Sequence, residues 1–210
     1  MTLPFPPLLV ISDRHQAARP LADVAEAVFT GGCRWFSLRE KDLPPEERRA
    51  LLGGLVTLGH RYGAVVTAHE DIEGVLAVGA DGVHLPSGIS PEAARAQLSR
   101  KLIGASAHDA DEATALLWAG ADYVTASPVF LTASKPGYGP ALGLDGLARI
   151  VARSSGPVVA LGGITAENAA SCIAGGARGV AVMGEVMRAT DPGATVEAIL
   201  RAMSTRSMQR

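Results

Sequence analysis

Charged side chains occur at the ends of several short apolar runs in this chain. Arg39 and Lys41 end the second of these runs, and because side chains alternate along an extended backbone, both point to the same side. Two cations on one side of a segment predict a site for an anion. The alternative is a solvated basic pair whose charge is matched by Glu40 and Asp42.

An imidazole and two carboxylates occur together in His69, Glu70 and Asp71, after the third apolar run. Mg2+ needs only one or two carboxylates when substrate phosphates complete its shell, so Glu70 and Asp71 are candidate metal ligands. His69 is a candidate for proton transfer, since a histidine pKa is ordinarily about 6.5. The alternative for the acidic residues is that they only stabilise the start of a helix through its dipole.

Glycines near the C-terminus predict a phosphate site. Gly162 and Gly163 precede a helix that we expect to start near Thr165, and Gly184 precedes another. Backbone N–H groups at helix N-termini attract anions, and the alternative is that the glycines merely allow tight turns. The longest loop, residues 127–143, is rich in Gly and Pro and carries Thr, Ser and Lys, which is typical of a functional loop.

One short unit occurs four times and indicates which elements position these residues. In each copy a glycine is followed at once by a short apolar run, at residues 32–37, 79–84, 120–125 and 176–181. Glycine just past a helix end supplies a left-handed C-cap, so each copy predicts a junction between a helix and a strand. Helix starts are indicated by capping side chains at Ser90, Asp109 and Asp191, and by Thr165 with Glu167 nearby.

Eight strands are expected, and their order predicts the fold. They lie at about residues 8–12, 34–39, 64–68, 81–85, 101–105, 122–126, 157–161 and 178–183. Eight βα units without a hairpin signal favour an α/β fold, a single (β/α)8 TIM barrel, with a doubly wound sheet as the alternative. We expect one domain over residues 1–210, with a frayed tail at 204–210. In such a barrel the active site lies in the loops after the strands, where the residues above occur.

Composition limits the classes of function. At 210 residues the chain is long enough for one domain with a sizeable core and too short for two ordinary ones. Nineteen Lys and Arg against 21 Asp and Glu give a net charge of −2, so we expect neither nucleic-acid nor membrane-surface binding. No apolar run approaches the roughly 18 residues of a membrane span, and the N-terminus lacks the basic start of a signal peptide. A cytoplasmic protein is expected, with Cys33 and Cys172 buried and reduced.

From Leu8 to about Leu200 the chain resembles the family of thiamine-phosphate synthases and TenI proteins. Five motifs carry the resemblance, Ser37–Lys41, Ala80–Leu85, Gly104–His108, Thr132–Lys135 and Leu161–Thr165. The family's synthases couple hydroxymethylpyrimidine diphosphate to thiazole phosphate with Mg2+, giving thiamine phosphate and diphosphate. The resemblance therefore implies small phosphorylated substrates and a role in thiamine biosynthesis, and it leaves a homo-oligomer open.

The same resemblance assigns candidate roles to individual residues. It implies that the diphosphate is held by Arg39, Lys41, Ser106 and Lys135, and the thiazole phosphate by Thr132, Ser134, Gly163, Met183 and Gly184. Ser37 and Gly162, inside the matching motifs, are further substrate-binding candidates. Arg39, Lys41, His69 and Lys135 are the candidate catalytic residues, since a ring of cations would stabilise the departing diphosphate.

Two departures from the synthase pattern leave three functions open. His69 and Glu70 replace an Asn-Asp pair, and Ile89 replaces the second metal aspartate, within a segment that resembles TenI tautomerases. Pro128, however, replaces the histidine that such tautomerases use. The alternatives are a synthase whose Mg2+ is held by Glu70, with Asp71; a metal-free thiazole tautomerase in which His69 transfers the proton; and a non-catalytic protein that binds thiazole or thiamine phosphate.

Overall fold

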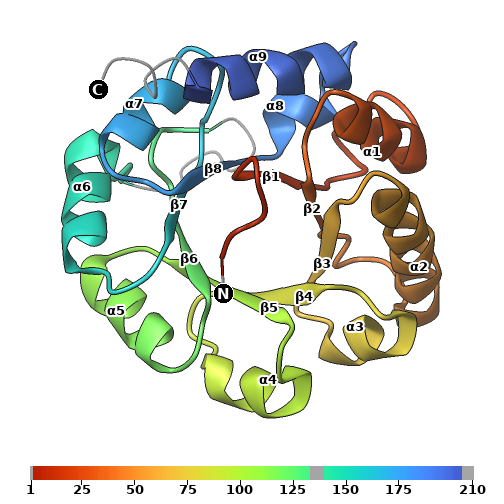
Figure 1. Ribbon diagram of the computed structural model, residues 1–210, viewed down its shortest axis with the longest axis horizontal. Helices are drawn as coiled ribbons and strands as arrows, with labels where there is room; N and C mark the ends of the chain where they lie inside the picture. The colour runs from red at the N-terminus through yellow and green to blue at the C-terminus, as the bar shows by residue number, and fades with distance from the viewer. Residues whose placement is uncertain (1, 133–139, 205–210) are drawn as a thin grey trace.

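Eight parallel strands close into a barrel in chain order, from β1 beside β2 around to β8 beside β1 (Figure 1). The computed structural model describes residues 2–132 and 140–204. The strands are β1 (Leu8–Ile11), β2 (Trp35–Leu38), β3 (Val65–His69), β4 (Gly82–Leu85), β5 (Leu102–Ala107), β6 (Tyr123–Ala126), β7 (Val158–Leu161) and β8 (Gly179–Val182). Each lies within one or two residues of its predicted position. The (β/α)8 barrel is confirmed, and the doubly wound alternative is wrong.

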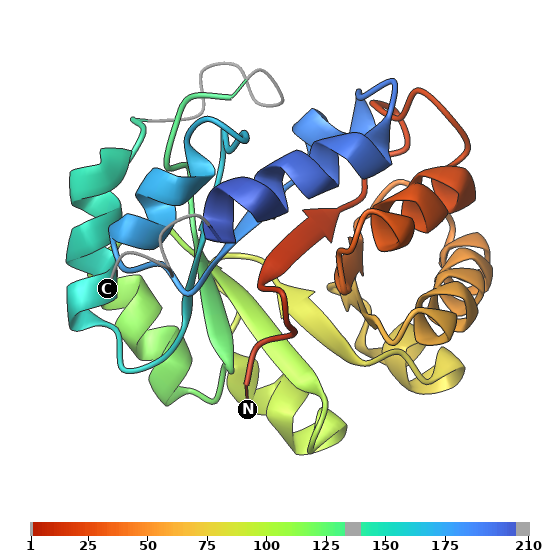
Figure 2. The same ribbon diagram turned by 45° about the horizontal axis from the view of Figure 1, so that its top comes forward.

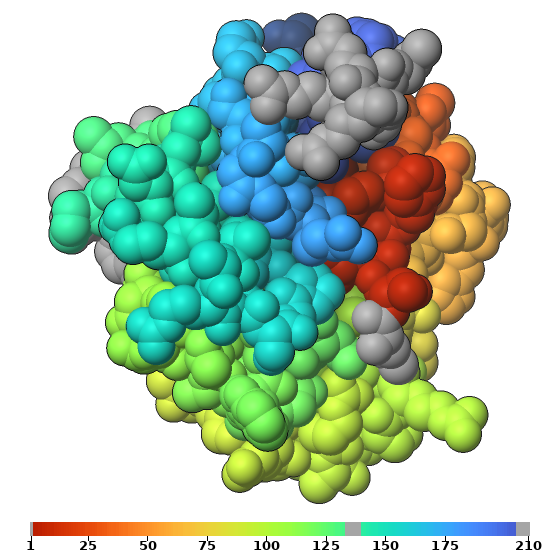
Figure 3. Space-filling model, turned by 60° about the vertical axis from the view of Figure 1, so that its left-hand side comes forward, coloured from red at the N-terminus to blue at the C-terminus, as the bar shows by residue number. Residues whose placement is uncertain are grey.

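Helices form an outer ring around the strands (Figure 1). They are α1 (Leu21–Thr30), α2 (Pro45–Arg61), α3 (Ile72–Val78), α4 (Pro91–Leu98), α5 (Ala110–Trp118), α6 (Gly143–Arg153), α7 (Ala169–Ala174), α8 (Gly184–Met187) and α9 (Pro192–Ser204). On one side of the molecule α5, α6 and α7 lie side by side and cover the strands (Figure 3). None of the helices in the described part of the chain is long and apolar enough to span a membrane.

The glycines of the repeated unit adopt the backbone conformation that the sequence predicts. The φ angles of Gly32, Gly79, Gly120 and Gly176 are 97°, 73°, 101° and 94°, in the left-handed region. Each glycine lies between the end of a helix and the start of the next strand. A residue with a side chain would be strained at these φ angles. Glycine adopts them without strain, which allows the tight turn from each helix into the next strand.

Three predicted helix starts are confirmed by side-chain caps. Ser90, Asp109 and Asp191 accept hydrogen bonds from the backbone N–H groups of Glu92, Glu112 and Ala194, at 3.4, 2.8 and 3.0 Å. The predicted tail at 204–210 begins with Ser204, the last residue of α9, and residues 205–210 lie outside the described part of the chain.

The prediction that a helix starts near Thr165 is wrong. α7 begins at Ala169, and a turn over residues 165–168 precedes it. The side chain of Asn168 closes this turn, accepting from the Thr165 N–H at 2.9 Å and donating to the carbonyl of Gly163 at 2.8 Å. The Thr165 N–H is therefore occupied within the turn.

The inside of the barrel differs between its two halves. β1, β7 and β8 contribute apolar side chains, Leu9, Ile11, Val159, Leu161 and Ala181. β2, β3, β4 and β6 contribute one buried polar side chain each, Ser37, Thr67, His84 and Thr125. Below them the rings of Trp35 and Tyr123 meet edge to face with centroids 4.8 Å apart.

The N-terminal segment closes one end of the barrel. Leu3 packs against the interior apolar cluster, and the segment that leads into β1 lies across the barrel opening in Figure 1 and extends below the barrel in Figure 2. The opposite end of the barrel holds the carboxyl ends of the strands, which is where barrels of this architecture bind their ligands. Cys33 and Cys172 are buried and unpaired, as expected.

Candidate functional site

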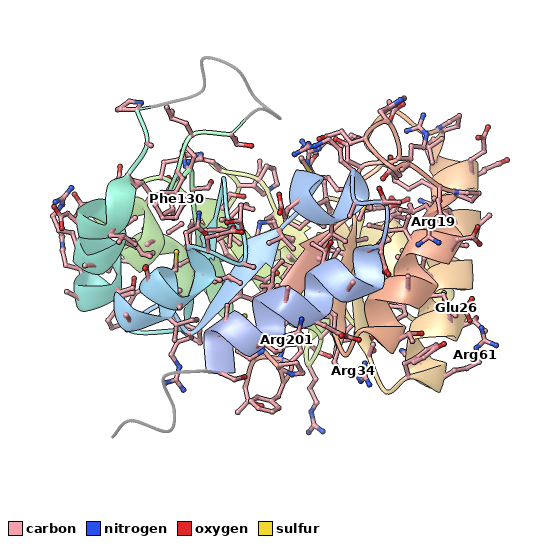
Figure 4. All side chains as sticks on the ribbon, turned by 90° about the horizontal axis from the view of Figure 1, so that it is seen from above. Arg19, Glu26, Arg34, Arg61, Phe130 and Arg201 are labelled. Carbon is pink, nitrogen blue, oxygen red and sulfur yellow. The ribbon has the colours of Figure 1, made fainter. Side chains whose placement is uncertain are left out.

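A cavity of about 530 Å3 opens at the carboxyl ends of the strands. Most of the predicted site residues line it, namely Arg39, Lys41, His69, Glu70, Ser106, Thr132, Gly162, Gly163, Met183 and Gly184. The labelled side chain of Phe130, in the loop after β6, lies at this end of the barrel, and that of Arg34, just before β2, lies at the other (Figure 4). The cavity is large enough for a drug-sized ligand.

Four predicted site residues are not placed in this cavity. Ser37 is fully buried inside the barrel, and its Oγ has no hydrogen-bond partner among the described residues. Asp71 caps α3, accepting from the Gly74 N–H at 2.8 Å, and its Oδ2 pairs with Nε of Arg48 at 3.1 Å. This arrangement matches the helix-start alternative for Asp71. Ser134 and Lys135 lie outside the described residues.

The side chains after β2 alternate as predicted. Arg39 and Lys41 line the cavity. Glu40 and Asp42 instead pair with Arg14, whose Nη1 lies 3.1 Å from Glu40 Oε2 and whose Nη2 lies 2.5 Å from Asp42 Oδ2. Arg14 holds the pKa of the exposed Asp42 carboxyl well below its usual range. The acidic pair therefore does not neutralise Arg39 and Lys41, and the alternative of a solvated, internally matched pair is wrong.

Glu40 is a buried carboxylate that organises this loop. Its side chain is 2% exposed, and its Oε1 accepts from Ser12 Oγ at 2.7 Å and from the Arg14 N–H at 3.1 Å. Ser12 Oγ in turn accepts from the backbone N–H of Arg39 at 2.7 Å. A buried carboxylate is stable only when such donors surround it. The contacts fix the backbone from which Arg39 reaches the cavity.

Glu70 adopts an unusual backbone conformation at the mouth of the cavity. Its φ of 63° lies in the left-handed region, which a non-glycine residue enters at a cost of about 1 to 3 kcal/mol. Its N–H donates to the carbonyl of His84 at 3.1 Å, and its carboxylate pairs with Nζ of Lys41. The left-handed turn separates Glu70, which lines the cavity, from Asp71, which caps α3.

His84 connects the barrel interior to the cavity. Its Nδ1 lies 3.1 Å from the hydroxyl of Tyr123, and its Nε2 lies 3.0 Å from Oγ of Ser106. Burial lowers the pKa of His84 to about 3 and raises that of Tyr123 above its usual range, so both groups are neutral. Gly104 makes room for this arrangement, because a Cβ there would overlap the Tyr123 ring.

His69 does not have the ordinary pKa that its proposed proton transfer requires. Burial lowers its pKa well below 6.5, and the neighbouring His84, Arg39 and Lys41 lower it further. The expectation of a pKa near 6.5 is therefore wrong, and the imidazole is neutral at pH 7. Its ring lies 4.8 Å from that of His84, and its buried Nε2 has no hydrogen-bond partner among the described residues.

The carboxylates at the mouth do not form a metal site by themselves. Among the described residues, no group of three His, Cys, Asp or Glu side chains has the arrangement of a metal site. Glu70 and Glu185 are the only carboxylates in the described lining, and Ile89 is half exposed. Any Mg2+ must take most of its ligands from a bound substrate or from water.

Gly162 and Gly163 permit close packing as well as lining the cavity. Their φ angles are 100° and 62°, and a Cβ on Gly162 would lie 2.8 Å from Cα of Pro128. One on Gly163 would lie 2.6 Å from the carbonyl oxygen of Leu131. The Phe130 N–H donates to the Gly162 carbonyl at 3.0 Å. The tight-turn alternative therefore describes one role of these glycines, and phosphate binding stays a prediction.

Three of the basic residues that line the cavity were not identified as site residues from the sequence, namely His84, His108 and Arg188. His84 was interpreted as a core residue, which its burial supports, yet it also lines the cavity. His108 lies in a matching motif, and its Nδ1 is 2.7 Å from the carbonyl of Ser127. Arg188 also lines the cavity and belongs to none of the five motifs. The only signal for it in the sequence is a cation shortly after the last strand.

Comparison with known proteins decides the family. The sequence profile described as thiamine monophosphate synthase matches residues 8–186, most of the chain. The chain belongs to the thiamine monophosphate synthase family. Among members of this family, the thiamine-phosphate synthase of Geobacillus kaustophilus is 38% identical over 92% of this chain and 90% of that protein. The thiamine-phosphate synthase of Roseiflexus sp. is 37% identical over 94% of this chain and 86% of that protein.

A solved structure agrees with this membership. The thiamine phosphate pyrophosphorylase of Pyrococcus furiosus matches with a TM-score of 0.85 and 32% identity, over 93% of this chain and 94% of that one. The resemblance inferred from the sequence motifs is thus confirmed. These relatives favour the synthase over the tautomerase among the three functions left open above.

Proposed function

We propose that this member of the thiamine monophosphate synthase family couples hydroxymethylpyrimidine diphosphate to thiazole phosphate. The observation that carries the proposal is that two predicted anion sites share one cavity. Arg39 and Lys41 line it after β2, and Gly163, Met183 and Gly184 line it after β7 and β8. A tautomerase acting on one phosphorylated ring would need only one of the two sites.

The reaction breaks one bond and forms another. The bond between the pyrimidine methylene carbon and the diphosphate oxygen breaks, and the diphosphate leaves with the electron pair. The thiazole ring nitrogen supplies the pair for the new carbon–nitrogen bond. Arg39 and Lys41 line the cavity, and in this proposal they lower the barrier by stabilising the negative charge that grows on the diphosphate.

The residues present suit Mg2+ that arrives with the diphosphate. Glu70 is the carboxylate that would hold the ion, and its pairing with Lys41, a predicted diphosphate-binding residue, supports this role. Bound Mg2+ would neutralise part of the diphosphate charge. Asp71 contributes no ligand in this proposal, because its carboxylate is engaged by Gly74 and Arg48.

His69 serves better as a neutral hydrogen-bonding group than as a proton-transfer residue. Its pKa lies well below 6.5, so it neither carries an acidic proton at pH 7 nor acts as an effective base. Its unpartnered Nε2 is instead suited to a polar atom of a substrate ring. This is the main physical argument against the metal-free tautomerase.

The test compares two acidic residues on the same side of the barrel. Thiamine phosphate formation is measured over a range of Mg2+ concentrations in Glu70→Gln and, as a matched control, in Glu73→Gln, whose carboxylate is largely exposed on α3. Loss of a metal-holding carboxylate is expected to lower turnover at limiting Mg2+ by about 10- to 100-fold in Glu70→Gln only. Product formation that persists in EDTA would overturn the proposed role of Glu70.

A further inference from the structure

Arg188, at the end of α8, presents a guanidinium to the cavity beside the glycines after β7 and β8. We propose that Arg188 binds the phosphate of the thiazole substrate and makes the enzyme prefer the phosphorylated thiazole over the free thiazole alcohol. This inference rests on the proposed function for the identity of the ligand. It adds a charged side chain to an end of the cavity where the sequence predicted only backbone groups and hydroxyls.

The guanidinium of Arg188 packs closely against Gly184. A Cβ built on Gly184 would overlap Nη1 of Arg188, and it would lie 2.8 Å from both Cζ and Nη2. The planar guanidinium therefore lies directly against the Cα of Gly184, in the space that any other residue would fill. Gly184 is itself buried and lines the same cavity. Gly184 and the guanidinium of Arg188 together give this end of the cavity a positively charged surface.

The guanidinium of Arg188 is held by a neutral side chain, which does not neutralise its positive charge. Nη1 of Arg188 donates to Oε1 of Gln16, which lies in the loop after β1. Among the described residues no carboxylate lies within 4.0 Å of the Arg188 nitrogens, although Glu185 lines the same region. Arg14, Arg48 and Arg95, by contrast, are each paired with an aspartate or glutamate. Arg188 thus differs from these structural arginines in the partner that it takes.

The chemistry of a guanidinium explains why the ligand should be a phosphate monoester. Its fork of N–H donors matches two phosphate oxygens at once, and charge-assisted bonds of this kind are stronger than neutral ones. A thiazole that carries a free hydroxyl offers one weak acceptor in the same place. Arg188 would therefore contribute to binding mainly when the phosphate is present, which makes it a residue that determines specificity.

The first experiment measures binding without turnover. Calorimetry is carried out with thiazole phosphate and with thiazole alcohol on the wild-type protein, on Arg188→Gln and on Arg188→Lys. Loss of charged hydrogen bonds is expected to weaken thiazole phosphate binding by about 10- to 100-fold in Arg188→Gln, with a smaller loss in Arg188→Lys. Binding of the alcohol should change little. Arg61→Gln, an exposed arginine on α2 at the rim of the helical ring (Figure 4), is the matched control and should leave both affinities unchanged.

A kinetic experiment separates this inference from the proposed function. In Arg188→Gln the KM for thiazole phosphate should rise while the KM for the pyrimidine diphosphate stays at its wild-type value. If the wild-type protein binds thiazole phosphate through Arg188 but makes no thiamine phosphate, the proposed function fails and this inference stands. Equal affinity of the wild-type protein and Arg188→Gln for thiazole phosphate would overturn it, as would failure of the wild-type protein to bind thiazole phosphate.

Discussion

The hydroxyl of Ser12 donates to the buried carboxylate of Glu40 at 2.7 Å while accepting from the backbone of Arg39 at the same distance. Ser12 follows β1 and Glu40 follows β2, so this contact joins two neighbouring loops at the mouth of the barrel. The backbone of Arg39, in the predicted diphosphate site, is thus held through Ser12 by the carboxylate of Glu40, which does not line the cavity. Ser12 holds the backbone of Arg39, while Glu40 and Asp42 pair with Arg14 rather than with Arg39 or Lys41.

We expect Glu40→Gln to impair both stability and the diphosphate site. The substitution removes the buried charge that accepts from Ser12 Oγ and from the Arg14 N–H, and loss of hydrogen bonds to a charged group costs about 1 to 3 kcal/mol in unfolding free energy. The KM for the pyrimidine diphosphate should rise, because the backbone of Arg39 loses its support. Urea unfolding and steady-state kinetics measure the two effects.

Asp42→Asn is the control for this prediction. It removes the other carboxylate that pairs with Arg14, but that side chain is half exposed, at 52%. Exposed ion pairs contribute about 0 to 1 kcal/mol, so its unfolding free energy should change little. Equal effects of the two substitutions on stability and KM would contradict the supporting role of Glu40.

Glu70→Gly should increase stability and decrease activity together. Glycine adopts the left-handed conformation of residue 70 without strain, which is expected to add about 1 kcal/mol to the unfolding free energy. The same change removes the carboxylate that faces Lys41, so Mg2+-dependent turnover should fall. Glu70→Ala is the comparison, since it removes the carboxylate and keeps the strain. A Glu70→Gly protein no more stable than Glu70→Ala would show that the strain is absent.

Stability should decrease as the pH falls below about 6.5, where an unfolded histidine takes up a proton. His69 and His84 have folded pKa values below that of the unfolded chain, so the unfolded state binds more protons in this range and is favoured. Each group contributes a slope of up to about 1.4 kcal/mol per pH unit. Urea unfolding from pH 7 to pH 5 should give a shallower slope in His69→Gln than in the wild-type protein. An unchanged slope would mean that His69 titrates normally in the fold.

Gly104→Ala should destabilise the barrel through Tyr123. The added Cβ overlaps the Tyr123 ring inside the barrel, and overpacking of this kind typically costs about 1 to 3 kcal/mol. The shift should also disturb the contact of Tyr123 with His84. Gly54→Ala, in the middle of α2 with nothing within 4 Å of the new Cβ, should instead stabilise by about 0.5 to 1 kcal/mol. Thermal unfolding of the two variants should therefore shift in opposite directions.

Local backbone and side-chain rules were enough to predict the architecture. The repeated glycines indicated the junctions because only glycine adopts the left-handed conformation easily, and four of the eight strands followed from the apolar run after each. Alternation along an extended segment likewise predicted that Arg39 and Lys41 share a side. These features depend on neighbours in sequence, which is why the sequence reveals them.

Features that depend on unusual backbone or on distant contacts were not predictable. The sequence left two roles open for Asp71, and the choice between them depends on the left-handed φ of Glu70, which no residue type there indicates. The low pKa of His69 results from burial beside His84, on the next strand. Arg188 reaches the cavity from the end of the short helix α8, which follows β8 directly, and its guanidinium packs against Gly184.

The most direct test of the account is a coupled measurement of both products. The purified protein is incubated with hydroxymethylpyrimidine diphosphate, thiazole phosphate and Mg2+, and thiamine phosphate and diphosphate are quantified over time. The account predicts that the two products appear in equal amounts and that chelation of Mg2+ stops both. Absence of thiamine phosphate at saturating substrates and Mg2+, with thiazole phosphate still bound, would contradict it.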